Sequence, residues 1–177
     1  MIIMRGKRGQ IWVETVIYTL IAFTLIGLVL TFAKPKIEEL QDKGLLDQSV
    51  NVLEEIDLVI KNIGSPGNQR VINLGIGKGT LNIDGENEKI FFEIESLYEY
   101  SDPGKEVERG NLLINNQQTG DFNRINLTIE YENHNITNQN LNTLRKIERS
   151  PNPYKVLISN EGLDEDEKTI INIEIIN

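Results

Sequence analysis

The chain has 177 residues, enough for one domain of ordinary size and an appended segment. It carries 27 acidic against 18 basic residues, a formal net charge of −9, so it lacks the clustered positive charge that binding to nucleic acid requires. It contains no cysteine, which excludes disulfides, thiolate zinc sites and a cysteine nucleophile.

An apolar run is the first element of the chain. It extends from residue 11 to residue 33, and Glu14 is its one charged residue. As a helix, these 23 residues would be about 35 Å long, enough to cross a hydrocarbon core of about 30 Å. Three basic residues and no acid precede the run, so the N-terminus should stay in the cytoplasm. The competing interpretation, a secretory signal peptide, would have a shorter apolar core of about 7–15 residues.

The helix is expected to continue beyond the apolar run as an amphipathic segment over residues 34–64. Apolar residues recur there at helical spacing, and Gly64, which precedes a Ser-Pro pair, is a typical helix end. Pro35 should kink the helix where the apolar run ends, and Gly44 could interrupt it. The sequence thus predicts one long, bent helix over residues 10–64.

From residue 65 on, apolar residues alternate with polar ones, which is typical of strands with one buried face. Strands are predicted at residues 71–76, 80–83, 90–97, 112–114, 125–131, 154–159 and 170–176. The Asn-rich stretch 133–153 is predicted to be a covering loop or a short helical turn. The predicted fold class is therefore α+β, with a long N-terminal hydrophobic helix followed by an antiparallel β-sheet or β-sandwich head over residues 65–177.

The junction in front of the apolar run carries a second pattern. A short basic leader ends at Gly9, Gln10 follows, and Glu14 is the fifth residue after the glycine. The apolar run begins directly after Gln10. This arrangement resembles the class III signal peptide of archaeal type IV pilins, which are subunits of surface filaments.

The resemblance implies how such a chain is processed. A prepilin peptidase would cleave between Gly9 and Gln10, which removes the leader 1–9 and keeps the helix 10–64. An assembly ATPase with its membrane platform would then move the chain from the membrane into an extracellular filament built of copies of itself. The head, residues 65–177, would lie outside the cell, and the filament would serve adhesion or surface contact.

Placing the Glu14 carboxylate in a membrane costs free energy, and the resemblance helps to explain why the residue is there. A carboxylate in a membrane helix costs about 2.5–3.5 kcal/mol at the bilayer centre and less near its edge, so it needs a partner. Cleavage would supply the new α-amino group of Gln10, in the same chain or in a neighbouring copy, and we expect this pair to set the axial register of assembly. In the alternative interpretation, Glu14 is an interfacial charge on a single-pass anchor. The chain is then a non-polymerising binding protein with a β-sandwich ectodomain.

Weaker patterns concern the head. Two Asn-x-Thr sequons make Asn126 and Asn135 candidate N-glycosylation sites. Residues 164–167 are all acidic, and we interpret them as a solvated turn rather than a cation site. His134 is the only histidine, which excludes a multi-histidine metal site. We therefore expect no catalytic site, no metal, no cofactor and no enzymatic activity.

Overall fold

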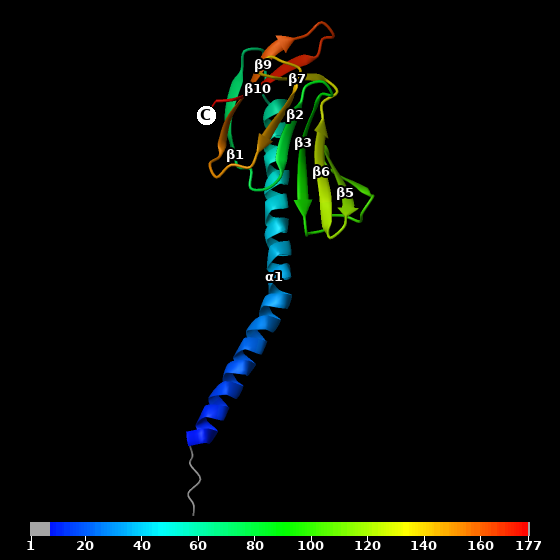
Figure 1. The fold of residues 1–177 in the computed structure, drawn as a ribbon. Coiled ribbons are helices and arrows are strands. Elements are labelled where there is room, and N and C mark those ends of the chain that lie inside the picture. Colours follow the sequence, from blue (N-terminus) through cyan, green and yellow to red (C-terminus); the bar gives the residue numbers. More distant parts are fainter. Residues whose placement is uncertain (1–7, 177) are drawn as a thin grey trace, which may run out of the picture. The chain divides into compact units, whose positions relative to one another are not determined.

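The structure is a computed structural model that describes residues 8–176, with side chains from Trp12 onward. Within that range, one helix precedes ten strands (Figure 1). The helix, α1, covers Arg8–Lys61, and the chain divides into two compact units between Leu40 and Gln41, inside α1. The first unit therefore holds the beginning of the helix, and the second unit, the head, holds the end of the helix together with the strands.

The helix of the first unit exposes its side chains on all sides. They are exposed from Trp12 to Phe32, and this part of α1 is long and apolar enough to cross a membrane. Thr19, Thr24 and Thr31 each donate a hydroxyl hydrogen bond of 2.8 Å to the carbonyl oxygen four residues earlier. Because these three hydroxyls are satisfied within the helix, they can enter hydrocarbon without an unpaired donor.

The helix continues through both of the breakers in its sequence. Pro35 lies inside α1, and the interruption expected near Gly44 is wrong. A glycine inside a helix costs only about 1 kcal/mol relative to alanine. Leu46, two residues further on, is completely buried in the head, and burial of a leucine side chain offsets a cost of that size. The kink at Pro35 stays a prediction.

The helix ends at Lys61, three residues before the end predicted at Gly64. Gly64 has a φ of 78°, a left-handed conformation that favours glycine beyond a helix C-terminus. Two asparagine amides satisfy carbonyl oxygens at this end. Asn68 Nδ2 donates to Ile63 O at 2.9 Å, and Asn160 Nδ2 donates to Gly64 O at 2.7 Å. The segment directly after the helix is thereby held by one nearby residue and by one that is distant from it in the sequence.

The strands of the head form two sheets, and neighbouring strands are antiparallel except for one parallel pair, β10 with β7. The four-stranded sheet has, in spatial order, β1 (Gln69–Leu74), β9 (Tyr154–Leu163), β10 (Thr169–Ile175) and β7 (His134–Asn138). The six-stranded sheet has β4 (Glu106–Arg109), β5 (Leu112–Thr119), β6 (Phe122–Glu130), β3 (Lys89–Ser96), β2 (Thr80–Asp84) and β8 (Leu144–Glu148). The predicted α+β class with a largely antiparallel head is confirmed.

The second half of α1 forms part of the core of the head. Its buried side chains recur at helical spacing and belong to one cluster with the inward side chains of both sheets; they are Leu46, Val50, Leu53, Ile56 and Ile60. The alternation predicted in β6 is confirmed, since Ile125, Leu127 and Ile129 are buried and the residues between them are not. In Figure 1 the cyan end of α1 runs beside the strands of the head. The head therefore includes the helix from Gln41 on.

The Asn-rich stretch 133–153 is not the loop or helical turn that its composition suggested. It contains β7, which pairs in parallel with β10, and β8, which pairs with β2. Each of these strands buries few apolar side chains, and β8 buries only Ile147. Pairing with strands distant in the sequence determines their conformation, which local composition does not reveal.

Candidate functional site

The junction that resembles a pilin leader lies at the start of α1. Gly9 and Gln10 are among the first residues of the helix, whereas the leader before Arg8 lies outside the described residues. The helix is continuous from there to Glu14, so Gln10 and Glu14 stand four residues apart on the same side of it. This spacing is the one that the predicted pair within a chain needs. Cleavage after Gly9 and the pairing itself stay predictions.

Glu14 is exposed and isolated within the apolar segment. No ion pair of Glu14 is found among the residues that the structure describes, and the next charged residue along the chain is Lys34. An unpaired carboxylate is costly in any apolar environment. A partner for Glu14 therefore has to come from the chain's own N-terminus or from another molecule.

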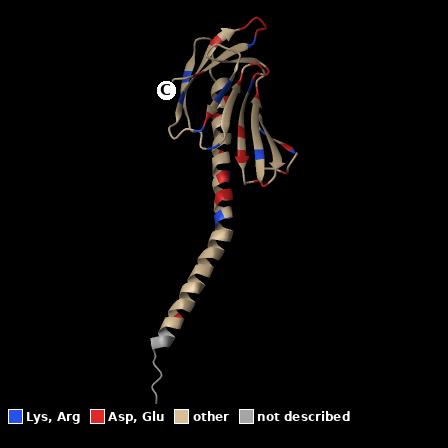
Figure 2. Ribbon diagram, in the orientation of Figure 1, with Lys and Arg blue, Asp and Glu red and all other residues tan. Residues whose placement is uncertain are grey.

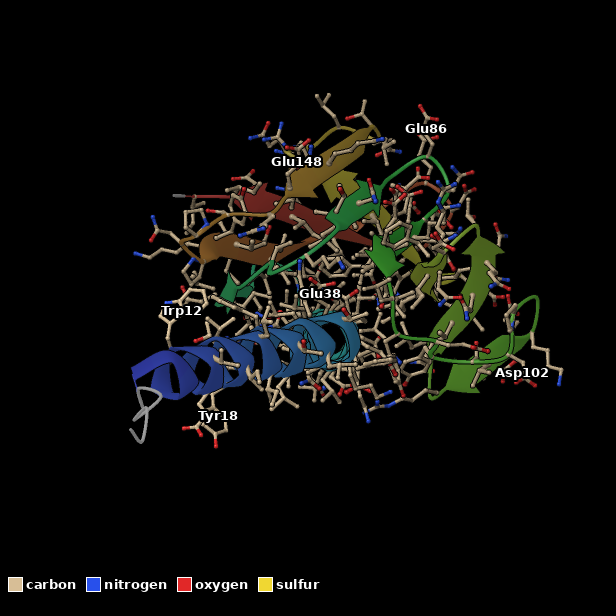
Figure 3. All side chains as sticks on the ribbon, turned by 60° about the horizontal axis from the view of Figure 1, so that its bottom comes forward. Trp12, Tyr18, Glu38, Glu86, Asp102 and Glu148 are labelled. Atoms are coloured by element: carbon tan, nitrogen blue, oxygen red, sulfur yellow. The ribbon has the colours of Figure 1, made fainter. Side chains whose placement is uncertain are left out.

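Large apolar side chains surround the segment that carries Glu14. Trp12 is 70% exposed, Tyr18 68% and Phe32 73%. Figure 3 shows Trp12 and Tyr18 projecting from different sides of the helix, and Figure 2 shows the same part of α1 as almost free of charge. A helix that is apolar all around is covered by lipid or by other helices rather than by water. This surface is thus the main candidate functional site of the first unit.

The two sequon asparagines occupy different environments in the head. Asn126 lies in the middle of β6, half-buried between Asn115 on β5 and Glu93 on β3. Asn135 lies in β7, where its Nδ2 donates a hydrogen bond of 3.0 Å to Asp164 Oδ2. Because an N-linked glycan attaches to Nδ2, modification of Asn135 would remove this hydrogen bond. Glycosylation at either asparagine stays a prediction.

The acidic stretch 164–167 forms a turn that is organised by Asp164. Oδ1 of Asp164 accepts the backbone N–H groups of Asp166 at 3.0 Å and Lys168 at 2.9 Å. The hydrogen bond from Asn135, followed by these backbone donors, lowers the pKa of Asp164. Lys168 in turn donates to Glu88 at 2.8 Å. Across residues 8–176, no three His, Asp or Glu side chains are arranged to hold a metal ion.

A pocket that the sequence did not predict opens on the head, with a volume of about 450 Å³. Three segments line it: the last turn of α1 at Lys61, the turn between β4 and β5 at Asn111, and the connection from β6 to the start of β7, which carries Tyr131 and His134. Tyr131 is only 4% exposed, and its ring meets the ring of His134 edge-on at 5.9 Å between centroids. We call this the Tyr131 pocket.

Asp57 of α1 lies close to the Tyr131 hydroxyl but is not part of the pocket lining. One oxygen of Asp57, Oδ2, accepts from Lys61 Nζ at 2.8 Å and from Asn111 Nδ2 at 3.2 Å. Burial raises the pKa of Tyr131 most, and the charge of the Asp57 carboxylate and a hydrogen bond with it raise that pKa further. Burial lowers the pKa of His134, so this imidazole is neutral at pH 7.

Sequence reasoning missed this pocket for a simple reason. The alternation predicted over residues 125–131 places Tyr131 on the buried face, and the structure confirms that burial. The residues around it, however, come from segments about 20 to 70 positions apart, and none of them forms a motif. Only the tertiary structure brings them together.

The fold and these two sites define a class of protein. Its head has two sheets with a helix in the core, and toward the N-terminus this helix continues into an exposed apolar segment that is long enough to span a membrane. No protein-family model, curated protein or solved structure matches the chain.

Proposed function

We propose that this chain is a pilin-like structural subunit of an archaeal type IV pilus-like extracellular filament, assembled through its N-terminal helix for adhesion or surface contact. One observation supports the proposal above all. The apolar segment is a continuous helix, exposed on all sides, with the single charge of Glu14 one turn after Gln10. A basic leader that ends at Gly9 directly precedes it.

Energetics supports polymerisation rather than permanent residence in lipid. In the bilayer, the Glu14 carboxylate lies near one end of the apolar run, where its cost is below the roughly 2.5–3.5 kcal/mol of the bilayer centre but is still unfavourable. In a bundle of like helices, the α-ammonium group of Gln10 from a neighbouring copy would neutralise it, while the surrounding apolar side chains cover one another. The same surface that holds the precursor in the membrane would then hold the filament together.

The proposal also defines the partners and the location of the chain. The precursor would lie in the cell membrane with its N-terminus in the cytoplasm, where a prepilin peptidase removes the leader. An assembly ATPase and its membrane platform would extract the mature chain into a homopolymer at the cell surface. This role is structural, and it requires neither catalysis nor a cofactor.

Mechanical shearing of cells that express the chain tests this function. We expect a filament fraction, sheared from the surface and pelleted, to contain the chain as visible filaments in negative-stain electron microscopy. A membrane protein without the leader pattern serves as the control and should stay with the cells. If the chain remains entirely in the membrane fraction of cells that express it, the single-pass anchored binding protein replaces the filament subunit as the explanation.

A further inference from the structure

Both edges of the six-stranded sheet are open. Among the strands that the structure describes, β4 has β5 as its one neighbour in the sheet, and β8 has β2. All four residues of β4 are exposed, and so are Leu144, Arg145 and Lys146 of β8. Neither strand contains a proline, and each pairs with its inner neighbour in an unbroken register, without a bulge. An edge of this kind presents unpaired backbone N–H and C=O groups, so it can accept a further strand.

The two edges carry charges of opposite sign. Arg145 and Lys146 are exposed on β8, whereas Glu106 and Glu108 are exposed on β4. None of these four side chains forms an ion pair with another residue that the structure describes. Charged side chains protect a sheet edge when they repel the edge of a second molecule. Here a basic edge and an acidic edge would attract each other.

These two edges cannot meet within one chain. Four strands lie between β4 and β8, which puts the edges about 24 Å apart at the usual spacing of strands. Figure 3 shows Glu148, the last residue of β8, and Asp102, which precedes β4, on different sides of the head. The remaining basic residue of β4, Arg109, is engaged by the helix, since its Nε lies 3.1 Å from Glu54 Oε1. The partner of either edge is therefore another molecule.

The direction of the strands favours a second copy of this chain as that partner. Every neighbouring pair in the six-stranded sheet is antiparallel, so the strand direction alternates from β4 to β8. The alternation continues without a break when β4 of a second copy follows β8 of the first. The four-stranded sheet lacks both features, because its edge strand β7 is parallel to β10 and carries no acidic residue to complement Arg70 of β1.

We propose that β8 of one copy of this chain pairs antiparallel with β4 of the next copy, so that the six-stranded sheet continues from head to head. The contact is heterologous, because it joins two different edges, and such a contact repeats along a row of copies unless the row closes into a ring. It therefore suits a filament, and in this respect the inference rests on the proposed function. It adds a contact between heads to the contact between apolar helices.

Charge and strand pleating select one register for this pair. Directly opposite residues share a face of the sheet, and Lys146 and Glu106 both lie on the outer face, because the residue after each of them pairs with a core residue of β2 or β5. With Lys146 opposite Glu106, no like charges stand opposite each other. A shift of two residues in either direction would place Arg145 opposite a basic residue, Arg109 or Lys105. We therefore expect Lys146 to face Glu106.

Disulfide cross-linking of the full chain tests this contact. The native chain has no cysteine, so every disulfide in the double variant Lys146→Cys/Glu106→Cys is an engineered one. Directly opposite residues of an antiparallel pair have Cβ atoms about 4.5–5.5 Å apart, close enough for oxidation to a disulfide. We expect a mild oxidant, added to sheared filaments and to isolated membranes, to produce a ladder of covalent multimers that collapses to the single chain on reduction.

Two kinds of control accompany this experiment. Each single variant should give no ladder, because a heterologous contact places its one cysteine opposite a different residue. The matched double control is Lys146→Cys/Asn73→Cys, whose second cysteine is in an exposed position of β1, at the edge of the other sheet. This control should give no ladder either.

A charge swap tests the same contact without cysteines. Lys146→Glu would face a like charge in the next copy, and we expect it to lower the amount of sheared filament about two- to tenfold. Adding Glu106→Lys restores opposite charges, so the double variant should form filaments in the native amount. Restoration separates the contact from a defect in folding, which a second substitution on a distant strand would not repair.

The outcomes separate this inference from the proposed function. Filaments that give no ladder, a ladder that is equally strong in the Asn73 control, or a charge swap without restoration would overturn the pairing of β8 with β4 and leave the filament standing. A ladder from the membranes of cells without filaments would keep the contact between heads and contradict the filament. Cells that give neither filaments nor a ladder would contradict both.

Discussion

Replacement of Glu14 by Gln is expected to leave leader cleavage and membrane insertion intact while filaments disappear or become scarce. Glutamine keeps the size of the side chain but removes the negative charge that would pair with the Gln10 α-ammonium group. A hydrogen bond between charged groups contributes about 1.5–3 kcal/mol, which corresponds to a change of roughly ten- to a hundredfold in each contact. Because every subunit repeats the contact, the loss accumulates along a filament. Mass spectrometry measures cleavage, and immunoblots of sheared fractions measure assembly.

Glu38→Gln is the matched control for this prediction. Glu38 lies on the same helix but beyond the apolar segment, and it forms an exposed ion pair of 3.7 Å with Lys34. Exposed pairs of this kind contribute about 0–1 kcal/mol, so Glu38→Gln should form filaments in normal amounts. If Glu14→Gln assembles as well as Glu38→Gln, then Glu14 does not set the register of assembly.

Truncation of Leu53 to Ala is expected to lower the free energy of unfolding of the head by about 2–5 kcal/mol. Leu53 is completely buried in the part of α1 that belongs to the head, where it joins the common core of the helix and both sheets. Removing most of its side chain loses transfer free energy and leaves a cavity. Proteolysis after brief exposure to increasing urea concentrations measures the fraction of unfolded head.

Leu58→Ala provides the comparison on the same helix. Leu58 lies five residues later, is 63% exposed and contributes little to the core, so its truncation should change the free energy of unfolding by less than about 0.5 kcal/mol. Equal effects of the two truncations would mean that this half of α1 is not part of the core of the head.

Periodicity in the sequence predicted the helix and the strands with clear alternation, because both patterns depend on neighbouring residues only. The apolar run predicted the first half of α1, and alternation in β6 identified the buried face around Ile125. In β10, Ile171 is buried as alternation predicts, but the neighbouring Asn172 is buried as well. The edge strand β4 escaped prediction because all four of its residues are exposed, so nothing in its pattern distinguishes it from a loop. β7 and β8 escaped because distant strands, β10 and β2, determine their conformation.

The two candidate sites differ in the same way, since one is formed by neighbouring residues and the other by residues far apart in the sequence. The junction around Gln10 and Glu14 could be found in the sequence, because its residues are consecutive and the charge stands out in an apolar run. The Tyr131 pocket could not, because Lys61, Asn111 and Tyr131 meet only after the helix and the six-stranded sheet have folded together. Alternation correctly predicted that Tyr131 is buried, but it contains no information about the partner of the hydroxyl.

N-terminal sequencing of the mature chain from sheared surface filaments tests the central claim most directly, since the whole account depends on cleavage that keeps the apolar helix. The account predicts that the first residue is Gln10. A chain that still begins at Met1 or Met4, or one that has lost the apolar segment up to residue 33, would contradict it.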